Sequence, residues 1–245
     1  NPNVTQSLNV LTNAGANTTT VTGGVTFSFS PRTINDLRVN FSRATGTTSF
    51  TLDDFGGAQP LPVSLVFPAG TVPEDAGFQF LSGANTNLAF GRNVDNVQRQ
   101  LNVVNNLSLV RGSHQLKFGV DYRRLTPIYD SLRYSQSVVY EGITGIVAAS
   151  PGTVLSGIAR SVQVFAGAGP RFPVFTNFSA YVQDTWRVTP RLSITGGLRW
   201  EFNPPPTEAK GNNPFAVHNL DNPPIIVLAD RGTKLWRTTY YNFAP

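Results

Sequence analysis

The sequence predicts an all-β fold, and three observations support this interpretation. First, residues 178–202 read FSAYVQDTWRVTPRLSITGGLRWEF, in which apolar and polar side chains alternate on both sides of a central turn. Successive side chains of a strand point to opposite faces, so this hairpin has one apolar and one polar face. Second, each arm has about 10 residues, the length that a tilted strand needs to cross a bilayer. Third, short turns alternate with long polar connections. Together these features predict an antiparallel, up-and-down transmembrane β-barrel segment with short periplasmic turns and long extracellular loops.

The composition favours contact with lipid over a compact soluble enzyme. Only 13% of the 245 residues are charged, against about 25% in soluble globular domains. The chain has no Cys, which excludes disulfides, thiolate catalysis and Cys-based metal sites. The net charge is +5, but the basic residues are scattered along the chain instead of clustered, so we expect no nucleic-acid partner.

Three hairpins of the same design are predicted within residues 23–46, 96–126 and 174–203. The turn of the first lies around residues 31–36, that of the second at 111–113 and that of the third at 188–191. Pro and Gly at these tips are typical of turns. The apolar phase, which we expect to face lipid, includes Phe27, Phe41, Leu107, Phe118, Leu198 and Trp200.

The connections between the hairpins are rich in Gly, Pro and Asn, and they cover residues 46–95, 126–175 and 203–239. Structureless loops of this length are uncommon in compact soluble domains. Residues 132–141 and 160–167 are two further candidate strands, which either cross the membrane or form a hairpin in an outer loop. Residues 143–158 are compatible with a short helix inside that loop.

A soluble or surface-displayed β-rich binding or adhesion module is the alternative interpretation. Such a module would pack the apolar faces of two sheets together. Its strands are usually about 5–6 residues long, however, which is shorter than the arms seen here. One residue breaks the pattern: Asp184 lies on the apolar phase. A position near the periplasmic rim beside Trp186 would tolerate it, and a bulge that turns Asp184 inward is the other explanation.

No combination of residues predicts an enzyme, a cofactor or a metal site. His114 lies in a turn and His218 in a Pro/Asn-rich connection, so we interpret both as solvated loop residues. The carboxylate pairs at 53–54 and 74–75 are compatible with a hard cation, but solvated loop charge is the preferred interpretation. Residues 167–170, GAGP, lack the setting of a phosphate-binding loop. Ligand-binding residues are not identified, and the candidates are polar-phase residues expected to face the lumen of the barrel: Arg38, Lys117, Asp121, Arg123, Arg199 and Glu201.

Residues 181–212, YVQDTWRVTPRLSITGGLRWEFNPPPTEAKGN, resemble the barrel of TonB-dependent outer-membrane receptors. The sequence is most similar to the Oar-type group, which carries a carboxypeptidase-regulatory-like N-terminal domain. Three more segments share the resemblance: 29–43, 110–124 and 241–245, the last of which opens the next strand in relatives. The resemblance covers most of residues 23–245.

The resemblance implies a barrel of about 22 strands with an N-terminal plug, located in the bacterial outer membrane and energised by TonB for import of a bulky nutrient. Its implied partners are outer-membrane lipid, an unidentified ligand, and TonB through the missing N-terminal region. Residues 1–245 would form one partial barrel domain without the plug and the remaining strands. The absence of Met and of a signal peptide likewise predicts a mature form or an internal fragment that does not transport by itself.

Overall fold

The computed structural model describes residues 6–82, 86–130, 132–140, 159–167 and 169–245. The chain divides into two compact units. The hairpin unit consists of Thr18–Ala44, Val97–Ile128 and Arg171–Pro245, and the long-connection unit consists of Asn1–Asn17, Thr45–Asn96 and Tyr129–Pro170. Each unit is described separately below.

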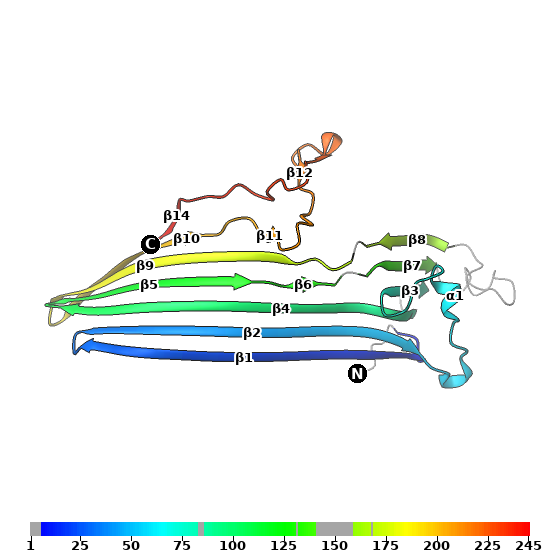
Figure 1. Ribbon diagram of the computed structural model, residues 1–245, viewed down its shortest axis with the longest axis horizontal. Coiled ribbons are helices and arrows are strands. Elements are labelled where there is room, and N and C mark those ends of the chain that lie inside the picture. The colour runs from blue at the N-terminus through cyan, green and yellow to red at the C-terminus, as the bar shows by residue number, and fades with distance from the viewer. Residues whose placement is uncertain (1–5, 83–85, 131, 141–158, 168) are drawn as a thin grey trace. The chain divides into compact units, whose positions relative to one another are not determined.

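The hairpin unit is built on one sheet of neighbouring strands in the order β1, β2, β4, β5, β9, β10 and β14. Their bounds are β1 Val10–Ser30, β2 Thr33–Leu52, β4 Thr86–Arg111, β5 His114–Leu125, β9 Pro173–Thr189, β10 Leu192–Phe202 and β14 Asn242–Ala244. Residues 10–17 of β1, 45–52 of β2 and 86–96 of β4 belong to the long-connection unit. The tight turns that join β1 to β2, β4 to β5 and β9 to β10 lie at one end of this sheet (Figure 1). β5 pairs directly with β9, and β14 pairs with β10. Residues 242–244 therefore form a further strand of the sheet beside β10.

Registered pairs show that the two faces of this sheet differ as the alternation predicts. On one face Leu107 lies opposite Phe118, Phe118 opposite Val182, and Val182 opposite Leu198. These side chains are not covered: Phe118 is 39% exposed and Leu198 is 47% exposed. A two-layer sandwich would bury them. The exposed apolar face is instead what a sheet in contact with lipid presents.

Several strands extend beyond the apolar alternation from which they were predicted. β1 begins at Val10, well before the predicted start at residue 23, and β4 begins at Thr86 instead of residue 96. β2 ends at Leu52 instead of residue 46. Residues 11–20 and 91–100 are mostly polar in both phases. A strand with water on both faces has no period-2 contrast, so hydropathy does not reveal it.

The long-connection unit has its own packed core, which corrects the prediction of structureless loops. It contains β3 (Ala76–Ser82), β7 (Tyr134–Tyr140), β8 (Ala159–Ala166) and the short α1 (Val63–Val66). Val66, Phe67, Phe78, Phe80, Val138 and Tyr140 form the buried cluster. β3 pairs with β7 in parallel, whereas β4 with β5, β5 with β9, β9 with β10 and β7 with β8 pair antiparallel. β7 and β8 pair with each other as a hairpin. They add no strand between β5 and β9, which favours the second of the two alternatives for these segments.

Short elements complete the described chain. They are β6 (Ile128–Tyr129), β11 (Thr207–Glu208), β12 (Val217–His218), β13 (Val227–Leu228), η1 (Phe55–Gly57) and η2 (Pro223–Ile225). The helix expected within residues 143–158 lies outside the described residues. Within the described ranges, none of the helices combines the length and the apolar character that a membrane crossing requires.

Candidate functional site on the polar face

The polar face of the hairpin unit carries all six residues that the sequence selected. Lys117 lies opposite Gln183, and Arg123 lies opposite Asn177. Asp121 and Glu201 each lie opposite Ser179, on either side of β9. Arg199 lies opposite Tyr181. Asn35 of β2 lies on the apolar face, where its side chain bonds to Asn105. Arg38 follows three residues later and therefore lies on the polar face. Pairing register therefore places these side chains on one face, and their contact with a ligand stays a prediction.

Four of the six line one hollow. Asp121, Arg123, Arg199 and Glu201 surround a cavity of about 210 Å³, together with Asn177, Ser179 and Asn203. Arg38 and Lys117 do not line it. The hollow forms because three neighbouring strands, β5, β9 and β10, present polar side chains on the same face in register. Ser179, which also lines the hollow, is 7% exposed.

The charges of this hollow are balanced and partly paired. Arg199 Nε lies 2.8 Å from Glu201 Oε1, an exposed ion pair of the kind that contributes about 0–1 kcal/mol. Asp121 Oδ1 accepts a hydrogen bond of 2.6 Å from Asn102 Nδ2, and Asn177 Nδ2 donates to Asn203 Oδ1 at 2.6 Å. Within the described chain, the Lys117 and Arg123 side chains have no ion-pair partner. They are free to bind an anionic group.

Next to the hollow, the Tyr181 side chain contacts two neighbouring strands in addition to its own. The Tyr181 hydroxyl of β9 donates to Asn106 Oδ1 of β4 at 2.9 Å. To reach it, the ring passes over Gly119 of β5, where an added Cβ would overlap the Tyr181 ring. Glycine leaves room for the ring, and the ring in turn covers the backbone that glycine exposes. This contact stabilises the neighbouring wall of the site.

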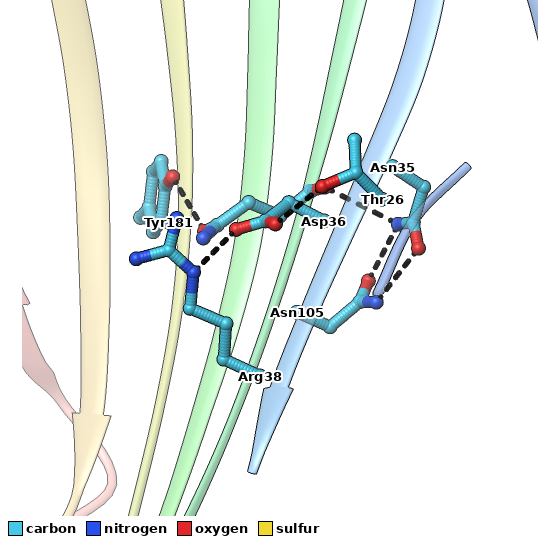
Figure 2. A network of polar contacts seen from close by, with 7 residues as sticks. Thr26, Asn35, Asp36, Arg38, Asn105 and Tyr181 are labelled. Atoms are coloured by element: carbon cyan, nitrogen blue, oxygen red, sulfur yellow. Dashed lines mark hydrogen bonds and ion pairs between the residues drawn. The ribbon is translucent and has the colours of Figure 1, made fainter. Parts of the chain in front are cut away.

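A polar network joins the first hairpin to the second (Figure 2). Asp36 lies between Thr26, which donates to it at 3.0 Å, and Arg38, whose Nε is 2.9 Å away. Asn35 and Asn105 face each other amide to amide and exchange two hydrogen bonds, of 2.9 and 3.0 Å. The amide pair lies on the apolar face, where its mutual bonding satisfies groups that lipid does not.

His114 is not the solvated loop residue that we expected. It begins β5, its Nδ1 lies 2.7 Å from Asp184 Oδ2, and its ring stacks on Trp186 at 5.6 Å. Asp184 remains in regular register with Leu116 and Gly196, so no bulge turns it inward. The pair has formed because His114 supplies a partner for the one carboxylate on the apolar phase of β9. Adjacency across strands, not sequence spacing, brings them together.

Aromatic residues also mark the opposite edge of the apolar band. Trp200 contacts Phe178 and Phe202, and Phe202 stacks on Tyr240. Trp200 Nε1 donates to the Tyr240 carbonyl at 2.8 Å. From His114 to Arg124, β5 runs about 34 Å, or about 26 Å along the normal at a tilt of about 40°. That matches an apolar band of about 25 Å between two aromatic girdles.

The other residues considered from sequence do not form a site. His218 is an exposed residue of β12. Asp53 accepts a bond from the Phe55 amide, and Asp75 lies 3.6 Å from Arg133. In the described part of the chain, no three His, Asp or Glu side chains converge as metal ligands. Residues 167–170 are not described as a whole, since residue 168 lies outside the described ranges.

Sequence reasoning missed Glu208, which fixes the connection after β10. Its carboxylate accepts hydrogen bonds from the amides of Phe172, Lys210 and Asn212 at 2.7–2.9 Å. Desolvation is the largest influence and raises the pKa of Glu208, but these three amides and the charge of Arg171 together outweigh it and lower the pKa. The Lys210 ammonium also lies 3.8 Å from the centre of the Phe172 ring. No local sequence motif predicts this arrangement.

An exposed apolar band between aromatic rows, backed by a polar and hydrogen-bonded face, defines the wall of an outer-membrane β-barrel. Comparison with known families agrees: the model of the family described as outer membrane beta barrel domain matches residues 1–245. The chain belongs to this family, and the protein is located in the bacterial outer membrane. Neither the curated proteins nor the solved structures contain a significant match.

Proposed function

We propose that this chain forms part of the wall of a TonB-dependent outer-membrane receptor that imports a bulky nutrient. In this proposal the polar face of the hairpin unit lines the lumen and contacts the plug and the passing ligand. The chain acts as wall and binding surface, not as an enzyme. TonB would engage the N-terminal region of the full-length protein, and outer-membrane lipid would contact Phe118, Leu198 and their in-phase neighbours.

The observation that carries the proposal is the hollow between Asp121, Arg123, Arg199 and Glu201. An up-and-down barrel that served only as an anchor would need no such mixture of charges on its inner face. Exposed donors at Lys117 and Arg123 suit a ligand or a plug segment with anionic or hydrogen-bond-accepting groups. The resemblance of residues 181–212 to TonB-dependent receptors supports the more specific assignment.

Cysteine accessibility in living cells tests the proposal without knowledge of the ligand. The chain has no Cys, so Arg123→Cys and the control Leu198→Cys would be single reporters once cysteines elsewhere in the full-length protein are replaced. A charged maleimide that does not cross membranes should modify Arg123→Cys and spare Leu198→Cys. With growth medium as the ligand source, deletion of TonB should slow modification of Arg123→Cys, because the plug then stays in place.

Two results would contradict the proposal at different levels. Equal modification at both positions would contradict the assignment of lumen and lipid faces. The second result uses a medium from which the wild-type strain takes up compounds and the TonB deletion strain does not. If Arg123→Cys is modified at the same rate in both strains there, TonB dependence alone is contradicted.

A further inference from the structure

Four exposed arginines gather at the end of the hairpin unit where the tight turns lie. They are Arg32, Arg111, Arg187 and Arg191, which we call the arginine rim. Backbone bonds align the turns: the Val110 amide donates to the Arg32 carbonyl at 2.8 Å, and the Arg187 amide donates to the Ser113 carbonyl at 2.9 Å. Arg191 lies in the tip between β9 and β10. Three turns that are far apart in sequence therefore present one basic edge (Figure 1).

The arginine rim has no opposing negative charge within the described residues. None of its four guanidinium groups makes an ion pair there. The two carboxylates nearest along these strands already have partners: Asp184 bonds to His114, and Asp36 bonds to Arg38 and Thr26. The edge consequently carries a net positive charge that a partner has to balance.

Adjacent residues show what kind of partner fits. Arg111 lies opposite His114, and His114 lies opposite Trp186, so the three form one row on the apolar face. Trp186 is exposed and stacks on His114. Tryptophan with an apolar body and a polar N–H is typical of the boundary between acyl chains and headgroups. The rim therefore begins where the lipid-facing band ends.

We propose that the arginine rim binds the phosphate groups of anionic phospholipids in the periplasmic leaflet of the outer membrane. Tight turns of outer-membrane barrels lie on the periplasmic side, which places the rim at that leaflet. Planar guanidinium groups bind phosphate with two parallel hydrogen bonds, and basic clusters beside a membrane attract anionic lipids. A soluble acidic protein would also match the charge, but it would not explain the row that joins Arg111 to Trp186. The proposal depends on the outer-membrane location and not on TonB.

Native mass spectrometry of the full-length protein in detergent tests this binding. The probes are phosphatidylglycerol and phosphatidylethanolamine with identical acyl chains. The wild-type protein should retain phosphatidylglycerol at least about 5-fold more than phosphatidylethanolamine. A variant with Arg32→Gln, Arg111→Gln, Arg187→Gln and Arg191→Gln should retain the two lipids about equally. A control with Arg43→Gln, Arg231→Gln, Lys234→Gln and Arg237→Gln loses the same number of charges and should keep the preference.

The proposal is wrong if the wild-type protein shows no preference, if the rim variant keeps it, or if the control loses it as well. Heat-dependent gel mobility checks that each variant has folded. If the rim variant does not fold, a salt titration of the wild-type protein decides instead. Retention of phosphatidylglycerol should fall several-fold between 0.05 and 0.5 M salt, since screening weakens exposed charge pairs. Retention that does not change with salt would overturn the proposal.

Discussion

The ring of Tyr181 lies over Gly119, and its hydroxyl bonds to Asn106 on the strand beyond. A single side chain thus contacts three strands, β4, β5 and β9. In sequence, a tight turn joins the first two and a long connection joins the last two. The arrangement requires that residue 119 have no side chain, and it makes specific predictions about stability.

Gly119→Ala should destabilise the full-length protein by about 1–3 kcal/mol, the usual cost of forcing extra atoms into a packed place. The added Cβ would overlap the Tyr181 ring and come within 2.6 Å of Asn106 Oδ1. Urea unfolding in lipid vesicles measures the change in free energy. Gly196→Ala is the matched control, because a Cβ there would have no neighbour within 4 Å. An equal effect of the two substitutions would contradict the role assigned to Gly119.

Leu198→Lys should impair folding into a membrane by about 2–4 kcal/mol if residue 198 lies near the bilayer midplane. The adjacent substitution Arg199→Ala should cost far less, because Arg199 lies on the opposite face and its ion pair with Glu201 is exposed. The yield of heat-modifiable protein and the free energy of unfolding in vesicles report both effects. Similar tolerance at the two positions would argue against the lipid-facing assignment.

Asn35→Leu should destabilise the protein by about 1–3 kcal/mol, because it leaves the Asn105 amide without its partner on the apolar face. The double substitution Asn35→Leu with Asn105→Leu should recover most of that loss, since both polar groups are then removed. Unfolding of the two single variants and the double variant forms a double-mutant cycle. Strictly additive effects would show that the two amides do not stabilise each other.

The connection after β10 should loosen in acid. The folded-state pKa of Glu208 is lowered. Its contribution to the stability of this connection is therefore fully present above the unfolded value of about 4.5 and is lost as pH falls through the lower folded value. Hydrogen exchange of the Phe172, Lys210 and Asn212 amides, corrected for intrinsic rates, measures this loss. Glu208→Gln should make exchange fast at every pH and remove the dependence. Protection that persists in the variant would mean that other contacts hold the connection.

Alternation was sufficient to predict the two faces of the hairpin unit. Each of the residues Phe27, Phe118 and Leu198 is exposed on the apolar side, because a period of two is preserved wherever lipid contacts one face and water the other. The tight turns were also predictable, since Pro190 and Gly112 mark the tips of their hairpins. The physical signal is local in both cases.

Contacts between distant residues were not predictable. Nothing near His114 in sequence points to Asp184, because strand pairing alone makes them neighbours. The parallel pairing of β3 with β7 and the burial of Phe78 on β3 likewise depend on long-range packing. The extension of β4 back to Thr86 escaped detection for a different reason, which is that residues 91–100 are mostly polar in both phases.

The apolar face is bounded by a cation at each edge, Arg111 beside the tight turn and Arg124 about ten residues farther along β5. This spacing suits a thin hydrocarbon layer such as that of the bacterial outer membrane. In bilayers made from longer acyl chains, one of the two guanidinium groups would be drawn among the tails unless the lipid compresses locally. Hydrophobic mismatch should therefore slow insertion into such bilayers, and membrane thickness becomes a condition for assembly.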